Sequence, residues 1–143
     1  MPIQDTVAVA ETKARYPNCV LCVEDDKDIL RLVQLSLERI GRMRAHTCSD
    51  PRLAIAQARG VRPDLIVLDL KMPELNGREL FQLLKADPDL RQIPVAFLTA
   101  NTGAAEVAAL HELGAAGVFL KPFDTGLAEQ LVDAWRRATS GDF

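Results

Sequence analysis

The residues of this sequence best suited to chemistry are acidic, hydroxyl and basic side chains that each follow a short apolar run. Glu24 and Asp25 follow the first run directly, Asp69 follows the third, Thr99 the fourth and Lys121 the fifth. Carboxylates brought together repel one another unless a cation intervenes, and a small set of oxygen ligands suits Mg²⁺. A lysine and a hydroxyl facing such a cluster supply the charge neutralisation and the hydrogen bond that a transferred phosphoryl group needs.

These side chains meet only if the elements between them fold into one parallel sheet. Apolar runs of strand length alternate with segments of helical spacing. Strands are predicted at 19–23, 42–48, 65–68, 94–98 and 117–120, and helices at 28–40, 51–59, 78–86, 102–113 and 125–138. Five such units predict an α/β fold with helices on both faces of the sheet, because right-handed crossovers place them there. Ligands of such sheets bind beyond the carboxyl ends of the strands, and the more polar strand 42–48 is expected at an edge.

Length and composition fit a single soluble domain. The chain has 143 residues, 48% of them apolar and 26% charged, and 17 Lys and Arg against 20 Asp and Glu give a formal net charge of -3. No basic run marks a nucleic-acid binder, and apolar stretches such as 65–68 are far shorter than a membrane helix. The first residues lack the apolar core of a signal peptide. We therefore expect a cytoplasmic protein that contacts neither nucleic acid nor membrane directly.

Taken together, the motifs resemble the receiver domain of the bacterial two-component response regulator family. The matching pieces are VEDD at 23–26, DLIVLDLKMP at 64–73, NG at 76–77, LTA at 98–100 and KPF at 121–123. The resemblance implies a flavodoxin-like (βα)5 fold, a doubly wound five-stranded parallel sheet with strand order 2-1-3-4-5. It places the receiver domain at residues 18–140, after an N-terminal extension at 1–17. Because one helix is expected after Lys121, we expect a stand-alone receiver without an output domain.

The resemblance also implies a role for each member of the cluster. Asp69 would be the phosphoacceptor, taking a phosphoryl group from a phosphohistidine of a sensor histidine kinase or a histidine phosphotransferase. Thr99 would donate its hydroxyl to the phosphoryl group, and Lys121 would pair with another phosphoryl oxygen. Mg²⁺ would be bound by Asp69 together with Glu24, Asp25 and the backbone carbonyl of Lys71. Such a domain is no enzyme in the usual sense, because it catalyses only its own phosphorylation and dephosphorylation.

Three further positions bear on the switch. Lys71 and Asn101, each two residues past a site residue, occupy positions that tune spontaneous dephosphorylation in relatives. Relatives often have Tyr or Phe three residues before the lysine, and that ring moves inward with the threonine on phosphorylation. Val118 stands there in this sequence, and Phe119 is expected to point to the opposite face of its strand. The substitution removes the ring of a Thr-and-aromatic switch but leaves the prediction of phosphorylation at Asp69 unchanged.

Partner surfaces are expected on two sides of the domain. On the helix at 28–40, Leu35 falls nearly opposite the apolar face and Leu32 falls on its flank. Each is either a singly exposed leucine, which is ordinary, or part of an apolar contact for the kinase or phosphotransferase, because the first helix docks there in relatives. Output is expected through an unidentified downstream protein. A homodimer would use the face built by the fourth helix, the fifth strand and the fifth helix.

Two motifs near the N-terminus have structural interpretations. Asp26 is expected to be a solvated residue or a helix cap rather than a metal ligand. Cys19 and Cys22 are spaced like half a zinc or redox site, but positions three apart in a strand face opposite ways and no second pair completes a tetrahedral site. We therefore expect buried structural thiols.

Two other functions remain open on the sequence. The first is a docking module of receiver fold that acts without phosphorylation, which the substitution at Val118 favours. The second is a phosphohydrolase of the haloacid dehalogenase type, which would form an aspartyl-phosphate intermediate. Those enzymes carry Asp-x-Asp after the first strand, whereas Asp69 follows the third strand and Lys71 stands two residues later. Turnover of a small phosphate ester would favour the phosphohydrolase.

Overall fold

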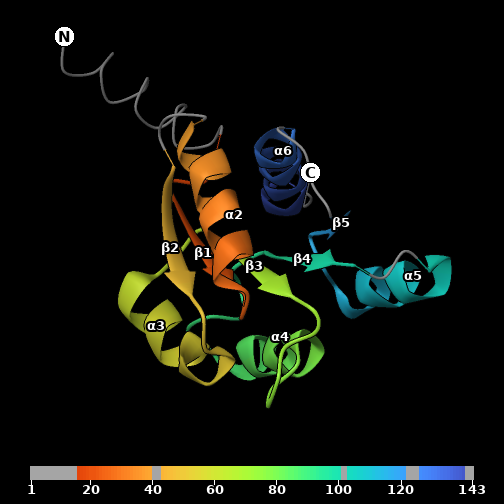
Figure 1. Ribbon diagram of the computed structural model, residues 1–143. Coiled ribbons are helices and arrows are strands. Elements are labelled where there is room, and N and C mark those ends of the chain that lie inside the picture. The colour runs from red at the N-terminus through yellow and green to blue at the C-terminus, as the bar shows by residue number, and fades with distance from the viewer. Residues whose placement is uncertain (1–15, 40–42, 101–102, 122–125, 141–143) are drawn as a thin grey trace, which may run out of the picture.

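The computed structural model describes residues 16–39, 43–100, 103–121 and 126–140. Its centre is a five-stranded sheet in the order β2-β1-β3-β4-β5 (Figure 1). The strands are β1 (Cys19–Val23), β2 (Arg44–Cys48), β3 (Leu65–Asp69), β4 (Val95–Thr99) and β5 (Gly117–Leu120). Every neighbouring pair is parallel. The predictions of a flavodoxin-like α/β fold and of its strand order are confirmed, and the more polar β2 lies at an edge as expected.

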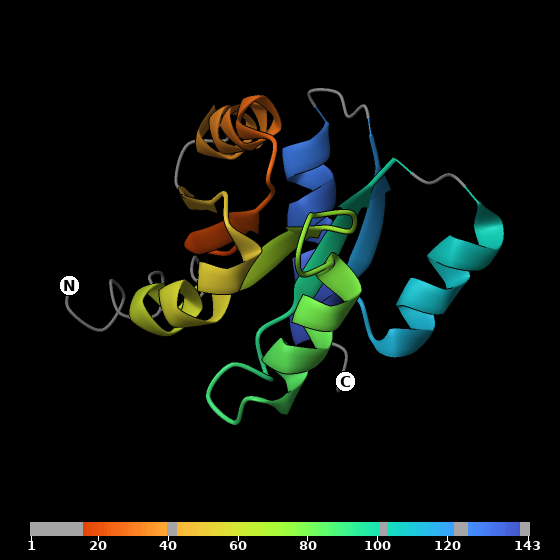
Figure 2. The same ribbon diagram turned by 60° about the horizontal axis from the view of Figure 1, so that its bottom comes forward.

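Helices cover both faces of this sheet (Figures 1 and 2). They are α2 (Lys27–Arg39), the short 3-10 helix η1 (Pro51–Leu53), α3 (Ala54–Val61), α4 (Gly77–Ala86), α5 (Ala104–Leu113) and α6 (Leu127–Thr139). Buried residues of α2 and α6 share one apolar cluster, and those of α3 and α4 share a second with Leu110 of α5. None of the described helices is long and apolar enough to cross a membrane.

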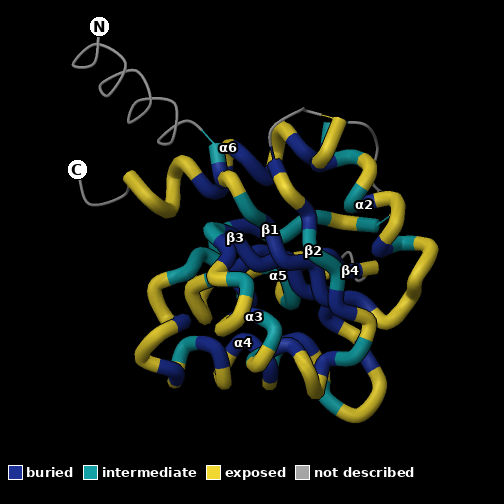
Figure 3. Tube along the Cα trace, turned by 90° about the vertical axis from the view of Figure 1, so that its left-hand side faces the viewer, coloured by how far each residue is buried: buried dark blue, intermediate teal, exposed yellow. Residues whose placement is uncertain are grey.

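Side chains of each strand alternate between these two clusters, as a period of two requires. Val20 and Cys22 of β1 belong to the cluster under α2 and α6, whereas Leu21 and Val23 belong to the other. Figure 3 shows the strands as the buried layer at the centre of the molecule. A sheet covered on both faces explains why its central strands β1, β3 and β4 are apolar at every position except the final residues Asp69 and Thr99.

The ends of two strands differ from the sequence-based boundaries in a way that matters for the site. The third strand was expected to stop at residue 68 and the fourth at 98, but β3 includes Asp69 and β4 includes Thr99. Asp69 still pairs with Leu98, because the parallel ladder continues for one more residue. Both polar side chains therefore project from ordered strands rather than from loops.

The helix expected at 51–59 begins as a 3-10 turn and extends further than predicted. Pro51 occupies the first position of η1, and the side chain of Asp50 accepts a hydrogen bond from the Arg52 backbone N–H. Proline suits this position because the first helical N–H needs no partner. The α-helical part then continues to Val61.

Some expected segments fall partly outside the described residues, namely 1–15 of the N-terminal extension, 40–42, 102, and 125 of the last helix. At the border of the extension, Tyr16 packs against the cluster under α2 and α6, and Pro17 is buried. The helix expected from 102 begins at Ala104 with Gly103 as its N-cap, and the last helix begins at Leu127.

Gly77 brings the start of α4 into contact with the end of β3. Its N–H donates to the Leu70 carbonyl at 2.8 Å. A Cβ at this position would lie 2.2 Å from the Asp69 carbonyl oxygen and 2.9 Å from the Leu70 Cα. These neighbours are backbone atoms and cannot rotate aside. The glycine is therefore required for the helix to begin this close to Asp69.

Gly77→Ala should destabilise the fold, because the added methyl group forces α4 away from β3. We expect a loss of about 1–3 kcal/mol in the free energy of unfolding, the usual range for an overpacked site. Gly60→Ala is the matched control, since a Cβ on this helical glycine meets nothing within 4 Å. It should be neutral or stabilising by up to about 1 kcal/mol. Urea denaturation measures both, and equal effects of the two substitutions would contradict the packing argument.

Candidate functional site

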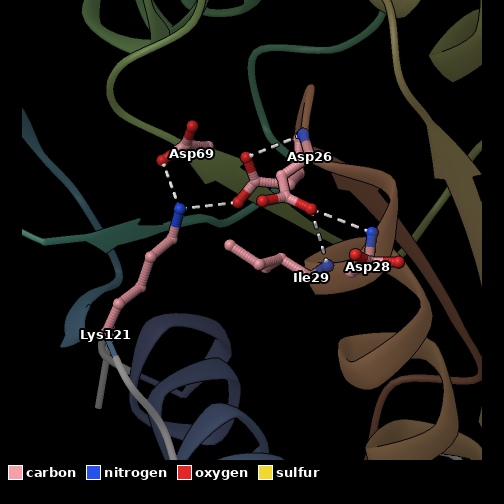
Figure 4. Close-up of polar contacts among 6 residues, drawn as sticks. Asp26, Asp28, Ile29, Asp69 and Lys121 are labelled. Atoms are coloured by element: carbon pink, nitrogen blue, oxygen red, sulfur yellow. Dashed lines mark hydrogen bonds and ion pairs between the residues drawn. The ribbon is translucent and has the colours of Figure 1, made fainter.

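Glu24, Asp69 and Lys121 meet at the carboxyl ends of the strands. The Lys121 Nζ lies 2.6 Å from the Glu24 Oε1 and 2.8 Å from the Asp69 Oδ1. Figure 4 shows the Lys121 side chain extended toward Asp69. The side chains of Glu24 and Asp69 are 4% and 6% exposed and that of Lys121 is 16% exposed, so the contacts are largely shielded from water.

The strand pairing brings these three residues together from distant parts of the chain. Val23 pairs with Leu68 across β1 and β3, which places the following residues, Glu24 and Asp69, side by side. Lys121 follows β5, two strands away from β3, and its backbone N–H donates to the Thr99 carbonyl at 2.9 Å. A long side chain is needed at this position because it must span the width of β4 to reach Asp69.

The site has more negative than positive charge. Burial raises the pKa of Glu24 to about 7, and the neighbouring Asp69 carboxylate adds to this rise while Lys121 opposes it. Burial alone would lower the pKa of Lys121, but its hydrogen bonds to Asp69 and Glu24 outweigh burial and raise it. One ammonium thus faces two carboxylates. A further cation would relieve the remaining repulsion.

Asp25 completes a set of oxygen ligands that fits a divalent cation. Glu24, Asp25 and Asp69 each offer a carboxylate oxygen, and the three oxygens lie within 4.8 Å of one another. Asp25 is exposed, so an ion held there would keep contact with water, as Mg²⁺ prefers. Among the described residues this is the one group of acidic, cysteine or histidine side chains close enough to hold a metal ion.

The other predicted site residues lie around this cluster or outside the described residues. Thr99 is the buried last residue of β4, next to β3. Lys71 is exposed in the loop that follows β3. Asn101 lies outside the described residues, so its predicted modulating role stays a prediction. Val118 packs against the cluster shared by α3 and α4, whereas Phe119 packs against the opposite one, as its place in the strand predicted.

Asp26 is a helix cap, one of the two roles expected for it. Its Oδ1 accepts hydrogen bonds from the backbone N–H groups of Asp28 at 2.9 Å and Ile29 at 3.3 Å (Figure 4). These contacts fix the start of α2 directly after Glu24 and Asp25. The two site residues are therefore held between the end of a strand and the first turn of a helix.

Among the described residues the cysteines belong to no metal-binding cluster and no disulfide. All three are free thiols, and Cys22 and Cys48 are buried. Burial raises the pKa of Cys22 to about 12, so the thiolate needed for metal binding or nucleophilic attack is suppressed. The expectation of buried thiols holds for these two, while Cys19 is half-buried.

Four charged residues in and around the loop after β3 were not predicted from the sequence. Arg52 pairs with Glu74 at 2.8 Å, and Arg78 at the start of α4 pairs with Glu106 of α5 at 2.7 Å. Residues 70–73, 76, 78 and 106 also line a pocket of about 580 Å³ beside this loop. The members of each pair are 22 and 28 residues apart in the sequence, and no periodicity or motif links them.

Known proteins match both the sequence and this arrangement. The family model described as the response regulator receiver domain matches residues 20–134. The chain is 39% identical over 100 residues to protein RcaC of Microchaete diplosiphon, an alignment covering 70% of this chain and 15% of RcaC. It is 36% identical over 104 residues to the alkaline phosphatase synthesis transcriptional regulatory protein PhoP of Bacillus subtilis, covering 73% of this chain and 42% of PhoP. The chain thus spans less than half the length of these curated relatives.

Solved structures of receiver domains and response regulators also match this chain. The receiver domain of a signal transduction histidine kinase from Syntrophus aciditrophicus superposes with a TM-score of 0.73 and 31% identity, covering 86% of this chain and 92% of that one. The chemotaxis response regulator CheY4 of Vibrio cholerae gives a TM-score of 0.72 and 28% identity, covering 84% and 97%. The parallel sheet and the acidic cluster at its carboxyl edge agree with the match to the family model. This chain belongs to the response regulator receiver domain family.

The raised pKa of Glu24 predicts how stability depends on pH in metal-free protein. A carboxyl group with a pKa of about 7 when folded and 4.5 ordinarily binds its proton more tightly in the folded state. The stability it contributes is complete below pH 4.5 and is lost as the pH rises through 7. We expect wild-type protein in EDTA to lose about 1–2 kcal/mol more than Glu24→Gln between pH 5 and pH 8. Urea denaturation at the two pH values measures the difference.

Glu38→Gln is the control for this experiment, because Glu38 is an exposed glutamate on α2. It should follow the wild-type pH dependence. Equal pH dependence of wild type and Glu24→Gln would contradict the assigned rise in the pKa of Glu24.

Proposed function

We propose that this receiver domain accepts a phosphoryl group on Asp69 from a phosphohistidine of a sensor histidine kinase or a histidine phosphotransferase. A carboxylate oxygen of Asp69 would attack the phosphorus, the P–N bond to the histidine would break, and the imidazole would leave with its electron pair. The observation that supports this most directly is the Lys121 ammonium 2.8 Å from the Asp69 Oδ1, at the carboxyl edge of a receiver sheet. A group transferred to Asp69 would arrive beside a positive charge.

The residues around Asp69 would divide the work of this transfer. Lys121 would pair with a phosphoryl oxygen, and the Thr99 hydroxyl would donate to another. Mg²⁺ fits the oxygen set of Glu24, Asp25 and Asp69, joined by the Lys71 backbone carbonyl, and when bound it would supply charge neutralisation at the phosphoryl oxygens. The burial of Glu24 and Asp69 would exclude bulk water and strengthen each of these charge interactions.

The phosphorylation state would be communicated through protein contacts. The output face would be built by α5, β5 and α6, where Leu113 and Leu120 are 37% and 42% exposed, and the same face would serve a homodimer. With Val118 in place of an aromatic residue, the signal would pass without a moving ring at that position. Apart from the substitution at Val118, which favours the phosphorylation-independent docking module, nothing among the described residues favours that module or the phosphohydrolase.

Phosphorylation at Asp69 is tested by intact-protein mass after incubation with acetyl phosphate. We expect a gain of one phosphoryl group in the presence of Mg²⁺ and none in EDTA, because the clustered carboxylates need a cation before an anionic donor can approach. Asp69→Asn should gain nothing, whereas Asp133→Asn, at an exposed position of α6, should behave as wild type. Label that persists in Asp69→Asn would overturn the site assignment. No gain with any donor would favour the docking module.

The docking surface for the phosphodonor protein is proposed on α2. Leu32 and Leu35 are 56% and 47% exposed, and both project from the helix that follows Glu24 and Asp25. The double variant Leu32→Ser, Leu35→Ser should slow transfer from a phosphorylated histidine phosphotransferase by about tenfold or more, because an apolar anchor at the centre of an interface is lost. Phosphorylation by acetyl phosphate should be unchanged, since it needs no protein contact.

Leu83→Ser is the matched control for the docking variant. Leu83 is 49% exposed on α4, at the other face of the sheet. Leu83→Ser should leave the rate of phosphorylation by both phosphodonors unchanged. The docking surface lies elsewhere if Leu83→Ser slows transfer from the histidine phosphotransferase as much as the α2 variant does. It also lies elsewhere if the α2 variant does not slow that transfer.

A further inference from the structure

Arg52 connects two loops at the carboxyl edge of the sheet. Its Nε lies 2.8 Å from the Glu74 Oε2 in the loop after β3. The same guanidinium is held by Asp50 in the loop after β2, with Nε 3.0 Å from Oδ1 and Nη2 2.8 Å from Oδ2. These hydrogen bonds also hold the pKa of Asp50 below its ordinary value. We call the contact among Asp50, Arg52 and Glu74 the Arg52 clasp.

The residue that the clasp holds has a strained backbone. Glu74 has φ +70°, a region that favours glycine. The Leu75 N–H donates to the Pro73 carbonyl at 2.7 Å, which closes a three-residue γ-turn around Glu74. Turns of this hand are rare and strained, and strained residues persist only where the surroundings hold them. Among the described residues, the Arg52–Glu74 ion pair of the Arg52 clasp is the one ion pair that contacts this turn.

The strained turn belongs to the loop that leaves the proposed phosphoacceptor. Glu74 comes five residues after Asp69 and three after Lys71, the residue whose carbonyl is proposed to bind Mg²⁺. The base of the loop is closed by the Gly77 N–H donating to the Leu70 carbonyl. Between these fixed ends the turn at Glu74 sets the course of the backbone. A contact that holds the turn therefore acts on the position of the Lys71 carbonyl.

We propose that Arg52, oriented by Asp50, is a positioning residue that holds the turn at Glu74 and, with it, the Lys71 carbonyl of the proposed Mg²⁺ site. The inference rests on the proposed function and concerns one residue outside the acidic cluster. Arg52 touches no reacting atom. Its side chain is 63% exposed and that of Glu74 is 56% exposed, and an exposed pair of this kind contributes little to global stability. We therefore expect the loss of Arg52 to change amide exchange in the loop rather than the free energy of unfolding.

Two substitutions of Glu74 separate the strain from the ion pair: Glu74→Gly removes both, whereas Glu74→Gln removes the charge and keeps a side chain at the strained φ. Glycine adopts φ +70° without steric cost, so the turn would no longer need to be held. Glu74→Gln should therefore loosen the loop as Arg52→Ala does, whereas Glu74→Gly should not, and Arg52→Ala should be silent in the Glu74→Gly background. If loss of the ion pair alone mattered, Glu74→Gly and Glu74→Gln would change the loop equally.

Amide hydrogen exchange of the metal-free protein tests the clasp without any phosphorylation. Arg52→Ala should speed exchange of the Leu75 and Gly77 N–H groups by about twofold to fivefold, the size expected when an exposed ion pair is lost. The change should vanish in the Glu74→Gly background. Arg31→Ala, at an exposed position of α2, is the control and should leave both amides unchanged.

Calorimetric titration with Mg²⁺ tests the link to the metal site. Arg52→Ala should weaken Mg²⁺ binding by about twofold to fivefold. Loss of a nearby positive charge would by itself strengthen cation binding, so weaker binding reports on loop position rather than on charge. Binding that is unchanged or tighter, or exchange that is unchanged, would overturn the positioning role. If instead Asp69 fails to be phosphorylated in the wild type, the proposed function fails while the exchange experiment still decides the role of Arg52.

Discussion

The repulsion between two buried carboxylates on neighbouring strands governs the rest of this site. Glu24 and Asp69 lie side by side because β1 and β3 pair in parallel, and both are shielded from water. Lys121 offsets one of the two charges, and its long side chain brings that charge from β5 across β4. The cluster with Asp25 still carries excess negative charge. That excess is the physical reason why the edge of this sheet is suited to a divalent cation and to a phosphoryl group bound with it.

The surrounding backbone maintains this electrostatic arrangement. Asp26 caps α2 immediately after Glu24 and Asp25, and Gly77 lets α4 begin against the carbonyl of Asp69. The capping box of Asn76 and Glu79 fixes the same helix start. Each of these residues lies within ten residues of a carboxylate of the cluster. The fold therefore holds the charged groups between two strand ends and two helix starts.

Much of this could be predicted from the sequence, because the fold and the acidic cluster both depend on local patterns. Strand-length apolar runs and the residues that follow them placed Glu24, Asp69 and Lys121 at one edge of the sheet. The pairing of Arg52 with Glu74 could not be predicted, since it depends on how two loops approach one another in space. The positive φ of Glu74 could not be predicted either, because glycine or asparagine is the residue expected at such an angle. The helix after Asp50 was expected to be α-helical from residue 51, but it begins with a 3-10 turn. Local propensity does not distinguish such a turn from the first turn of an α-helix.

Asp69 is proposed to form the acyl phosphate itself, and chemical trapping identifies the residue that carries the phosphoryl group. Borohydride reduces an aspartyl phosphate to homoserine, so peptide mass mapping of the phosphorylated and reduced chain identifies the modified residue. We expect homoserine at position 69 and at no other acidic position, with none formed when EDTA removes the divalent cation. Homoserine at position 24 or 25, or a phosphorylated chain in which Asp69 stays intact, would contradict it.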